Sequence, residues 1–347
     1  MHDFSTRLIN WQRQHGRHGL PWQVSDPYKI WLSEIMLQQT QVATVAEYYP
    51  RFLAAFPSVH DLAAATQDDV LKLWAGLGYY SRARNLHKAA AQIVQDFGGN
   101  FPQRRSELEQ LCGVGRSTAA AIAAFAFQQR ETILDGNVKR VLCRVFALDG
   151  NPSDKAFERQ LWAQAESLLP ERPADMPAYT QGLMDLGATV CKRSRPDCPR
   201  CPMADICQAK AQNRTAELPR KKTAAAVSEL PLFLLHLCDP NGRTLLHQRP
   251  QHGIWAGLYC LPCFEDLTSL QQFAAVFRLP ENALHRDAVF AHRLTHRLLN
   301  ITVLTARLPE NAPPSEGIWT DNPTAYALPK PLSRYLSSGH SAQLHFG

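Results

Sequence analysis

Four cysteines close together constrain this chain more than any other feature of its sequence. Cys191, Cys198, Cys201 and Cys207 are spaced C-x6-C-x2-C-x5-C, with no histidine among them. Four thiolates at this density suit a tetrahedral metal ion or an iron–sulfur cluster. A zinc ribbon usually has two C-x-x-C knuckles separated by a longer loop, whereas this segment has one knuckle between two single cysteines. The spacing therefore favours a cluster over zinc, and over four unrelated buried thiols.

Basic side chains separate the four cysteines. Lys192, Arg193, Arg195 and Arg200 lie between them. A loop held at both ends by a metal group would present these charges rigidly, as a patch that binds phosphate. A solvated run of charge is the alternative interpretation of the same residues.

The remaining cysteines, five of the 9 in the chain, lie outside this loop. The N-terminus turns polar at His2-Asp3, so we expect no secretory signal and a cytoplasmic protein, in which disulfides are rare. We expect Cys112, Cys143 and Cys238 to be core thiols. The motif Cys260-Leu261-Pro262-Cys263 has no second pair nearby, and we interpret it as packing at the end of a strand.

Length and composition indicate a globular protein of two domains. The chain has 347 residues, of which 45% are hydrophobic and 20% charged, enough for two separate cores. No apolar run is long enough to span a membrane. The formal net charge of +6 is a mild bias toward polyanionic partners and is weak evidence by itself.

The N-terminal part, residues 1–212, is predicted to be a helical region. Asp26-Pro27 is a typical helix start, an N-cap followed by proline. Apolar residues recur at helical spacing in the segments Ile30–Val45, Val70–Trp74, Arg82–Gln95, Ser117–Phe127, Val138–Ala147 and Ala156–Leu168.

The apolar period changes after a linker at residues 213–228, whose stretch 219–226 we expect to be basic and exposed. Short apolar runs separated by turns then predict strands at Leu230–Leu237, Thr244–Gln248, Leu258–Leu261 and Leu299–Leu304. Residues 229–347 are therefore expected to form a separate α+β domain.

A Gly-x-Gly turn, Gly113-Val114-Gly115, joins two of the predicted helices. The glycines permit a tight turn and leave backbone N–H groups free at the start of the next helix. An anion such as a DNA phosphate binds well at such a place. An ordinary helical hairpin would have the same sequence pattern, so the motif by itself leaves both interpretations open.

Two acids are candidates for chemistry. Glu34 shares a helical stripe with Ile30 and Leu37, and a carboxyl group in an apolar setting has a raised pKa and can donate a proton. The alternative is a surface ion pair between Glu34 and Lys29. Asp135 precedes a predicted helix, where it can serve as an N-cap or as the second of two carboxylates that act on one glycosidic bond.

Taken together, these features resemble the adenine DNA glycosylases of the helix-hairpin-helix and endonuclease III superfamily. The resemblance covers nearly the whole chain. Besides the hairpin and the four-cysteine loop, it is carried by the segments Leu32–Gln41, Gly76–Asn85 and Ile133–Arg140. It implies a mainly α helix-hairpin-helix fold with an iron–sulfur loop, followed by a Nudix-like α+β domain.

The resemblance implies a base excision repair enzyme that acts on double-stranded DNA. It would flip out adenine mispaired with 8-oxoguanine or guanine and hydrolyse its N-glycosidic bond, preventing G:C to T:A mutation. By matching positions, Glu34 would protonate the adenine, Asp135 would stabilise the sugar cation and Asn137 would orient Asp135. The cysteines of the loop would hold one [4Fe-4S] cluster. We expect such an enzyme to be a monomer in the cytoplasm, associated with the nucleoid through DNA.

The same matching gives the residues expected to contact DNA. Among them, Gln39 and Tyr79 would enter the double helix around the lesion pair. The full set is Leu37, Gln39, Thr40, Tyr79, Gly113, Gly115, Ser117, Lys139, Arg193, Thr295 and His296.

The second domain resembles the Nudix hydrolase fold without its catalytic motif. The paired acids that bind magnesium are missing after Gly257, so we expect this domain to bind rather than to hydrolyse. Its recognition loop matches residues 292–296. Leu294 stands where many relatives have phenylalanine, whereas the hydroxyl of Thr295 and the imidazole of His296 are retained.

Three other functions are weighed against this one. A bifunctional glycosylase-lyase of the same fold has a lysine nucleophile where Ser117 stands, and serine cannot form a Schiff base. Lys139 could still react adventitiously and give weak lyase activity. A non-catalytic iron–sulfur or zinc sensor would not need Glu34 together with Asp135. A nucleotide pyrophosphohydrolase would need the missing magnesium motif.

Overall fold

The computed structural model describes residues 2–220 and 227–338, and the chain divides into two compact units. Unit 1 consists of Met1–Ala65 and Asn85–Thr223, and unit 2 of Thr66–Arg84 and Ala224–Gly347. The basic stretch expected in the linker lies outside the described residues from position 221 onward. Each unit is described here by itself.

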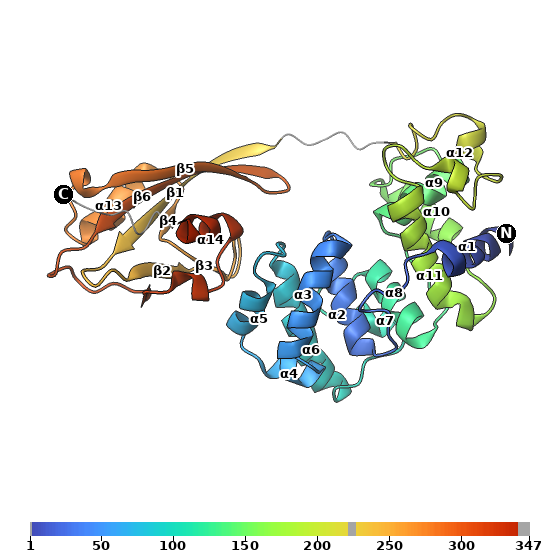
Figure 1. The fold of residues 1–347 in the computed structure, drawn as a ribbon, viewed down its shortest axis with the longest axis horizontal. Helices are drawn as coiled ribbons and strands as arrows, with labels where there is room; N and C mark the ends of the chain where they lie inside the picture. Colours follow the sequence, from blue (N-terminus) through green and yellow to red (C-terminus); the bar gives the residue numbers. More distant parts are fainter. Residues whose placement is uncertain (1, 221–226, 339–347) are drawn as a thin grey trace. The chain divides into compact units, whose positions relative to one another are not determined.

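Unit 1 is helical, and the helices predicted from apolar spacing lie there, apart from one in unit 2 (Figure 1). A single π-helical turn, η2, comes directly before the first cysteine of the loop. The elements are α1 (His2–His15), α2 (Pro27–Leu37), α3 (Val42–Ala55), α4 (Val59–Ala64), α6 (Ser81–Phe97, which begins in unit 2), α7 (Arg105–Leu108), α8 (Arg116–Phe127), α9 (Gly136–Val145), α10 (Lys155–Glu166), η1 (Pro173–Asp175), α11 (Met176–Asp185), η2 (Leu186–Val190), η3 (Cys198–Arg200) and α12 (Gln208–Ala211).

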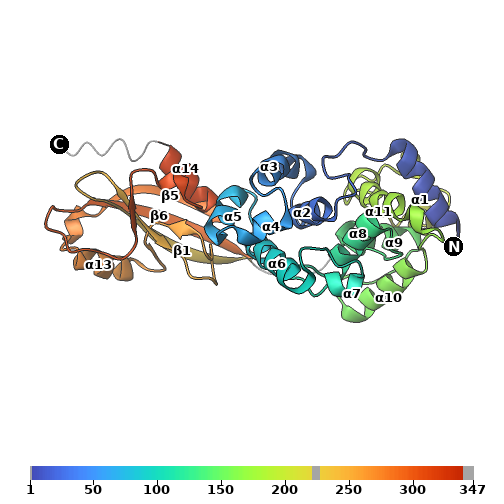
Figure 2. The same ribbon diagram turned by 90° about the horizontal axis from the view of Figure 1, so that it is seen from below.

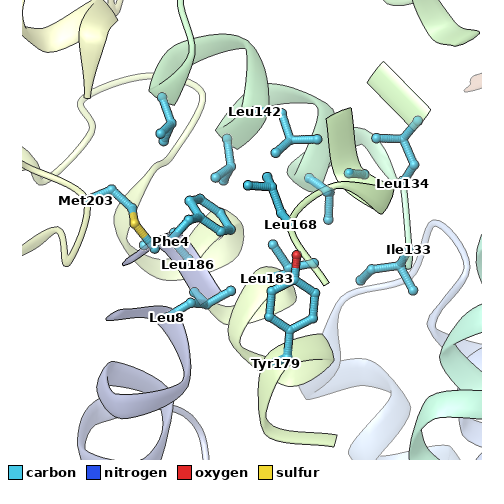
Figure 3. Packing of buried hydrophobic residues seen from close by; sticks show 14 of the residues in the cluster. Phe4, Leu8, Ile133, Leu134, Leu142, Leu168, Tyr179, Leu183, Leu186 and Met203 are labelled. Atoms are coloured by element: carbon cyan, nitrogen blue, oxygen red, sulfur yellow. The ribbon is translucent and has the colours of Figure 1, made fainter. Parts of the chain in front are cut away.

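A buried apolar cluster holds the helices near the cysteine loop together (Figure 3). It joins the N-terminal helix α1 to α9, α11 and the segment before α9. Tyr179 and Leu183 of α11 are almost fully buried there, as is Leu142 of α9. Labelled in the figure are Phe4, Leu8, Ile133, Leu134, Leu142, Leu168, Tyr179, Leu183, Leu186 and Met203. The segment that carries Asp135 is thus anchored by the core on its N-terminal side.

The prediction of a continuous helix over Ile30–Val45 was wrong. α2 ends at Leu37, and α3 begins only at Val42. Gln39 between them has a φ of 57° in the left-handed region, and the Thr40 N–H bonds back to the Leu37 carbonyl at 3.3 Å. A left-handed residue cannot continue a right-handed helix, so the chain turns here even though the apolar spacing continues through it.

Unit 2 contains a mixed sheet of seven strands, with the path β3-β2-β1-β6-β5. β1 pairs with β6 in parallel and β6 with β5 antiparallel, so β1 and β6 lie at its centre. The elements are α5 (Gln67–Trp74), β1 (Ser228–Cys238), β2 (Thr244–Gln248), β3 (Tyr259–Cys260), β4 (Cys263–Phe264), α13 (Leu267–Val276), η4 (Glu281–Ala283), β5 (His285–Arg293), β6 (Arg297–Arg307), β7 (Ile318–Thr320), η5 (Pro323–Ala325) and α14 (Lys330–Ser337).

Two helices cover opposite faces of this sheet, as Figure 2 shows. Leu235 and Leu237 of β1 pack in one buried cluster with Leu270 of α13. The residue between them, His236, faces the other way and meets the Tyr335 hydroxyl of α14 at 3.0 Å. Successive residues of a strand point to opposite faces, which is why β1 is apolar almost throughout and not alternating.

Residues 66–84 belong to unit 2 through hydrogen bonds to the C-terminal fold. The Tyr259 hydroxyl donates to Asp68 Oδ2 at 2.7 Å, and Gln248 Nε2 donates to Asp68 Oδ1 at 3.1 Å. Arg84 Nη1 donates to the Ala256 carbonyl at 2.6 Å. Unit 2 is therefore assembled from two separate stretches of sequence.

Candidate active site

Glu34 lies on α2 and lines a pocket whose wall also includes Trp22, Leu37 and Gln181. Burial is the main reason that the pKa of the Glu34 carboxyl rises to about 8, and the negative charge of Asp135 adds to the shift. An acid with this pKa is largely protonated at neutral pH and can donate its proton. The Glu34 carboxyl is therefore a proton donor that faces a cavity able to hold a ligand.

The alternative of a surface ion pair for Glu34 does not match the structure. Lys29 Nζ lies 3.9 Å from Asp26 Oδ2, and Asp26 is the N-cap of α2, as the Asp-Pro sequence predicted. Lys29 therefore pairs with the start of its own helix.

A buried polar network forms another part of the wall of the Glu34 pocket. Asp185 is fully buried and accepts hydrogen bonds from Arg17 N at 2.8 Å, Arg17 Nε at 2.6 Å and Gln181 Nε2 at 2.9 Å. Arg17 and Gln181 both line the pocket, so Asp185 holds two polar side chains where a flat heterocycle could hydrogen-bond to them. Sequence reasoning missed these three residues because no motif connects them along the chain.

Asp135 is the N-cap of α9. Its Oδ1 accepts from Val138 N at 2.8 Å, and its Oδ2 accepts from Asn137 Nδ2 at 3.4 Å. Just before it, Leu134 N donates to Ser117 Oγ at 3.0 Å, which ties this segment to the first turn of α8. The capping interpretation is thus correct for one oxygen, while the second oxygen is bound to Asn137.

Arg140, one helical turn after Asn137, fixes that amide from the other side. Its Nη2 donates to Asn137 Oδ1 at 2.8 Å and to the Gly187 carbonyl at 2.6 Å, and its Nε donates to the Cys191 carbonyl at 2.8 Å. A continuous chain of hydrogen bonds therefore runs from the cysteine loop through Arg140 and Asn137 to Asp135. Sequence reasoning assigned no role to Arg140.

Asp135 and Asn137 line a second pocket that is rich in arginine. Arg140, Arg144 and Arg193 contribute to its wall. Several guanidinium groups beside a capped carboxylate make this pocket attractive for a phosphate or another anionic group. Glu34 lines a different pocket, yet the charge of Asp135 is close enough to raise its pKa.

Lys139 is less available than the sequence suggested. Its ammonium group forms an ion pair with Glu158 of α10 and lies 3.5 Å from the Pro152 carbonyl. A DNA phosphate would have to compete with that carboxylate.

The Gly-x-Gly turn has the expected local structure. Gly113 has a φ of 79°, and a Cβ there would come within 2.8 Å of the Asn85 side chain. Gly115 is the N-cap of α8 and has no side-chain cap, so the first N–H groups of α8 have no capping side chain over them. Gln38, which sequence reasoning did not single out, donates to the Gly113 carbonyl at 3.3 Å and links this turn to the end of α2.

The other residues expected to contact DNA in unit 1 lie around the turn between α2 and α3. Gln39 is exposed in that turn, Thr40 beside it is half-buried, and Leu37 lines the Glu34 pocket. The turn therefore places the exposed Gln39 two residues after Leu37, which lines the pocket that holds the acid.

Four cysteine side chains line one apolar cavity, as their spacing suggested. Cys191, Cys198, Cys201 and Cys207 share it with Arg144, whose Nη1 lies 3.4 Å from Cys191 Sγ. Among the described residues, no three metal-binding side chains lie close enough to hold a single ion. Four thiols that line one apolar cavity are a donor set that fits an iron–sulfur cluster.

In unit 2, the residues expected to recognise the lesion lie together. Tyr79 has a φ of 50° and is 46% exposed, and its hydroxyl lies 3.3 Å from Thr295 Oγ1. Thr295 and His296 form the exposed turn between β5 and β6. These residues line one pocket with Arg84.

Comparison with known families agrees with both halves of the chain. Residues 32–167 match the HhH-GPD superfamily of base excision DNA repair proteins, and residues 233–338 match the NUDIX domain. An adenine DNA glycosylase of Buchnera aphidicola is 36% identical, with 96% of each chain covered. The chain belongs to the adenine DNA glycosylase family.

Other similar proteins cover part of the chain. The human adenine DNA glycosylase is 45% identical over 62% of this chain and 41% of its own length. The solved structure of a thermostable thymine-DNA glycosylase is 28% identical, with a TM-score of 0.54 over 60% of this chain and 95% of its own. As a family member, the chain is a DNA N-glycosylase of base excision repair with a helix-hairpin-helix region and a Nudix-like domain, and both parts of the expected fold are confirmed. None of the described helices is long and apolar enough to cross a membrane.

Because Glu34 holds its proton in the folded state, it should couple stability to pH. Its pKa of about 8 lies above the ordinary value of 4.5, so between these values the unfolded chain releases a proton that the folded protein keeps. The free energy of unfolding is therefore expected to fall as the pH rises from 4.5 to 8. Glu34→Gln, which cannot ionise, should reduce this fall in urea unfolding measured at several pH values. Glu47→Gln, at an exposed position of α3, is the control and should keep the wild-type change of unfolding free energy with pH. If Glu34→Gln also keeps it, the raised pKa is assigned to the wrong group.

Arg140 is expected to support both Asp135 and the cysteine loop. Arg140→Gln leaves the carbonyls of Gly187 and Cys191, which lie in partly buried hydrogen bonds, without their donor, and an unsatisfied acceptor costs up to about 3 kcal/mol when it is fully buried. Arg140→Lys keeps the positive charge but lacks the several N–H donors of the planar guanidinium, so it should recover only part of the lost unfolding free energy. Unfolding free energy and single-turnover excision should fall together in Arg140→Gln. Arg159→Gln, at an exposed position of α10, should change neither quantity; if Arg140→Gln behaves in the same way, Arg140 does not support the site.

Proposed function

We propose that this glycosylase excises adenine paired with 8-oxoguanine or guanine in double-stranded DNA. The observation that carries the proposal is the Glu34 carboxyl lining a pocket, where burial and the nearby charge of Asp135 raise its pKa to about 8. Two carboxyl groups with different environments are the usual solution for cleavage through an oxocarbenium-like sugar. Removing adenine from such pairs prevents G:C to T:A mutation.

Glu34 acts as the general acid. The adenine enters its pocket after leaving the base stack, because the glycosidic bond cannot be reached inside the duplex. Glu34 donates its proton to N7 of the adenine, and the protonated base is a better leaving group. Arg17 and Gln181, fixed by the buried carboxylate of Asp185, provide polar groups that can hydrogen-bond to the base.

Asp135 stabilises the positive charge that develops on the sugar. Asn137 holds one carboxylate oxygen, and Val138 N holds the other, so the group needs little rearrangement when the charge forms. A transient covalent bond to the sugar is compatible with this position. Water then completes the hydrolysis.

The enzyme is proposed to be monofunctional. Ser117 stands where a lyase would have its lysine, and its hydroxyl is bonded to Leu134 N. The nearby amine, Lys139, is paired with Glu158. A Schiff base requires a free amine, so any lyase activity is weak.

DNA is proposed to bind across the hairpin and the adjacent turn. The N–H groups after Gly113 and Gly115 donate hydrogen bonds to a phosphate at the start of α8, and Ser117 and Lys139 are proposed to contact the same backbone. Arg193, exposed at the arginine-rich pocket, binds another phosphate. Gln39, flanked by Leu37 and Thr40, enters the base stack at the flipped position.

The four cysteines are proposed to hold one [4Fe-4S] cluster. When bound, the cluster ties the two ends of the basic loop together. Arg144 supports the same loop through hydrogen bonds to the carbonyls of Lys192 and Arg193 at 2.7 and 3.1 Å. The role proposed for the cluster is structural: it keeps Arg193 and its neighbours in position for phosphate.

The C-terminal domain, residues 229–347, is proposed to read the base opposite the adenine and not to hydrolyse nucleotides. Thr295 and His296 offer a hydroxyl and an imidazole in an exposed turn. Tyr79, hydrogen-bonded to Thr295, provides an aromatic ring to stack beside the lesion. The catalytic region is assigned to residues 1–212, and the enzyme is proposed to act as a monomer.

Loss of the general acid should abolish chemistry but not binding. Glu34→Gln keeps the shape of the side chain and removes the proton, so excision from an adenine·8-oxoguanine duplex is expected to fall roughly 10²–10⁴-fold. Asp135→Asn should behave in the same way, while both variants retain affinity for the duplex. Alkali cleavage of abasic sites measures the rate. The proposal fails if Glu34→Gln excises adenine as fast as Glu47→Gln, the exposed control.

The metal content distinguishes a cluster from zinc. Protein purified from iron-replete cells should be yellow-brown and contain iron and sulfide in the ratio of one cubane cluster per chain. Cys198→Ser should lower iron content, solubility and DNA affinity, whereas Cys238→Ser on β1 should keep the iron. Stoichiometric zinc without iron would contradict the assignment.

Removal of the recognition side chains should reduce selectivity more than catalysis. Hydrogen bonds that only the oxidised purine completes are worth roughly 1–3 kcal/mol, so Thr295→Ala with His296→Ala should reduce the preference for 8-oxoguanine over guanine by up to about two decades. Single-turnover excision at saturating enzyme should change little. Gln272→Ala, exposed on α13, is the matched control. If the double variant keeps the same preference for 8-oxoguanine over guanine as this control, recognition is assigned to Gln39 and Tyr79.

A further inference from the structure

The cysteines outside the four-cysteine loop have different surroundings. Cys143 and Cys238 are buried singly, and burial raises the pKa of both thiols, that of Cys143 to about 12. Thiols in that state are poor nucleophiles, because the thiolate is the reactive form. Cys260 and Cys263 form a pair in unit 2, which sequence reasoning interpreted only as packing.

The backbone of unit 2 brings these two cysteines together. Cys260 ends β3, opposite His247 of β2, and Cys263 begins β4, opposite Leu234 of β1. The turn between them is held by Leu235 N, which donates to the Pro262 carbonyl at 2.9 Å. The C-x-x-C turn and the two strand pairings therefore place Cys260 and Cys263 together in one turn, near enough that each shifts the pKa of the other.

The two thiols differ in access and in charge. Cys260 is fully buried, whereas Cys263 is half-buried and can be reached from solvent. The neighbouring Cys260 thiol is the main reason that the pKa of Cys263 falls below its ordinary value. Burial opposes this shift, the positive charge of Arg249 lowers the pKa further, and the charge of Glu265 raises it more weakly. The accessible sulfur is thus the one that more readily becomes a thiolate.

Arg249 provides an independent observation at the same place. Its Nε is buried and has no hydrogen-bond partner among the described residues. Its backbone is fixed, since Arg249 N donates to the Leu258 carbonyl at 2.8 Å. A buried guanidinium N–H without a partner is unfavourable unless an anion is near, and a Cys263 thiolate would supply that negative charge.

We propose that Cys260 and Cys263 form a peroxide-reactive dithiol, in which Cys263 attacks first and Cys260 resolves the product to a reversible disulfide. This inference is independent of the function proposed above. It adds a modification site to the C-terminal domain, residues 229–347. A hydroperoxide is the oxidant, and a small thiol is the reductant.

The chemistry balances in two steps. The Cys263 thiolate attacks one oxygen of a hydroperoxide, a sulfur–oxygen bond forms, the oxygen–oxygen bond breaks, and the released alkoxide or hydroxide takes a proton. Cys263 is now a sulfenic acid. The Cys260 thiol loses its proton and attacks that sulfur; the sulfur–sulfur bond forms, and hydroxide leaves and becomes water. Two thiols have lost two electrons and two protons, and exchange with a thiol reverses the change.

Mass spectrometry of the full-length protein tests this directly. The protein is treated with hydrogen peroxide at equimolar concentration, alkylated after denaturation and digested with trypsin. The segment 244–278 contains Cys260 and Cys263 and no other cysteine. It should lose alkylation at both positions and become lighter by two hydrogen atoms, and a thiol reductant should restore it. Cys143 and Cys238 in the same sample should remain alkylated.

Variants identify the role of each group. Cys263→Ser should leave Cys260 alkylated after peroxide, whereas Cys260→Ser should trap Cys263 as a sulfenic acid that reacts with dimedone. Arg249→Gln should slow the loss of free thiol roughly tenfold, because less thiolate forms without the cation, and Arg249→Lys should restore part of the rate. Thermal unfolding checks that each variant folds. If Cys263→Ser does not fold, Cys263→Ala is used for the same test. Full alkylation of both cysteines after peroxide in the wild type, or oxidation of Cys260 at the wild-type rate in Cys263→Ser, would overturn the proposal.

Discussion

The guanidinium of Arg140 joins three segments that lie far apart in the sequence. It binds the Asn137 side chain on its own helix, the Gly187 carbonyl in the π-helical turn and the Cys191 carbonyl at the start of the cysteine loop. A side chain at Gly187 would come within 2.5 Å of Asn137 Cβ, so the close approach of these segments also requires a glycine there. Through this contact, the position of Asp135 depends on the fold of a loop whose sequence lies more than fifty residues further on.

The two acids of the site differ because the fold treats them differently. Glu34 is enclosed by α2 and the pocket wall, so its carboxyl is held in the neutral form. Asp135 instead caps a helix and receives hydrogen bonds on both oxygens, an environment that suits a charged carboxylate. Asp135 adds to the difference, since its charge further favours the protonated form of Glu34. A proton donor and a charge stabiliser can therefore coexist at one pH.

Motifs with strong local physics could be predicted from the sequence. The Asp26 cap, the glycine turn and the shared cavity of the four cysteines all depend on short stretches of chain, and the structure has each of them. The turn at Gln39 was missed because apolar spacing continues through it, and only the left-handed backbone interrupts the helix. β5 was missed as a strand because its residues are half-exposed and lack a clear apolar alternation. The network of Asp185, Arg17 and Gln181 could not be predicted, because it depends on tertiary contact between α11 and the segment after α1.

Tertiary contact also decides what each cysteine can do. The four loop cysteines line one cavity, and their close spacing is visible in the sequence. That they share one site therefore follows from the local pattern. Cys260 and Cys263 have a local pattern too, but part of the effect that favours the Cys263 thiolate comes from the charge of Arg249, which follows β2. The same C-x-x-C beside a neutral residue would form less thiolate and react more slowly. Reactivity in this chain is therefore assigned by the charge that the fold brings to a sulfur atom and by its access to solvent, whereas the number of cysteines and their spacing only set which pairs can meet.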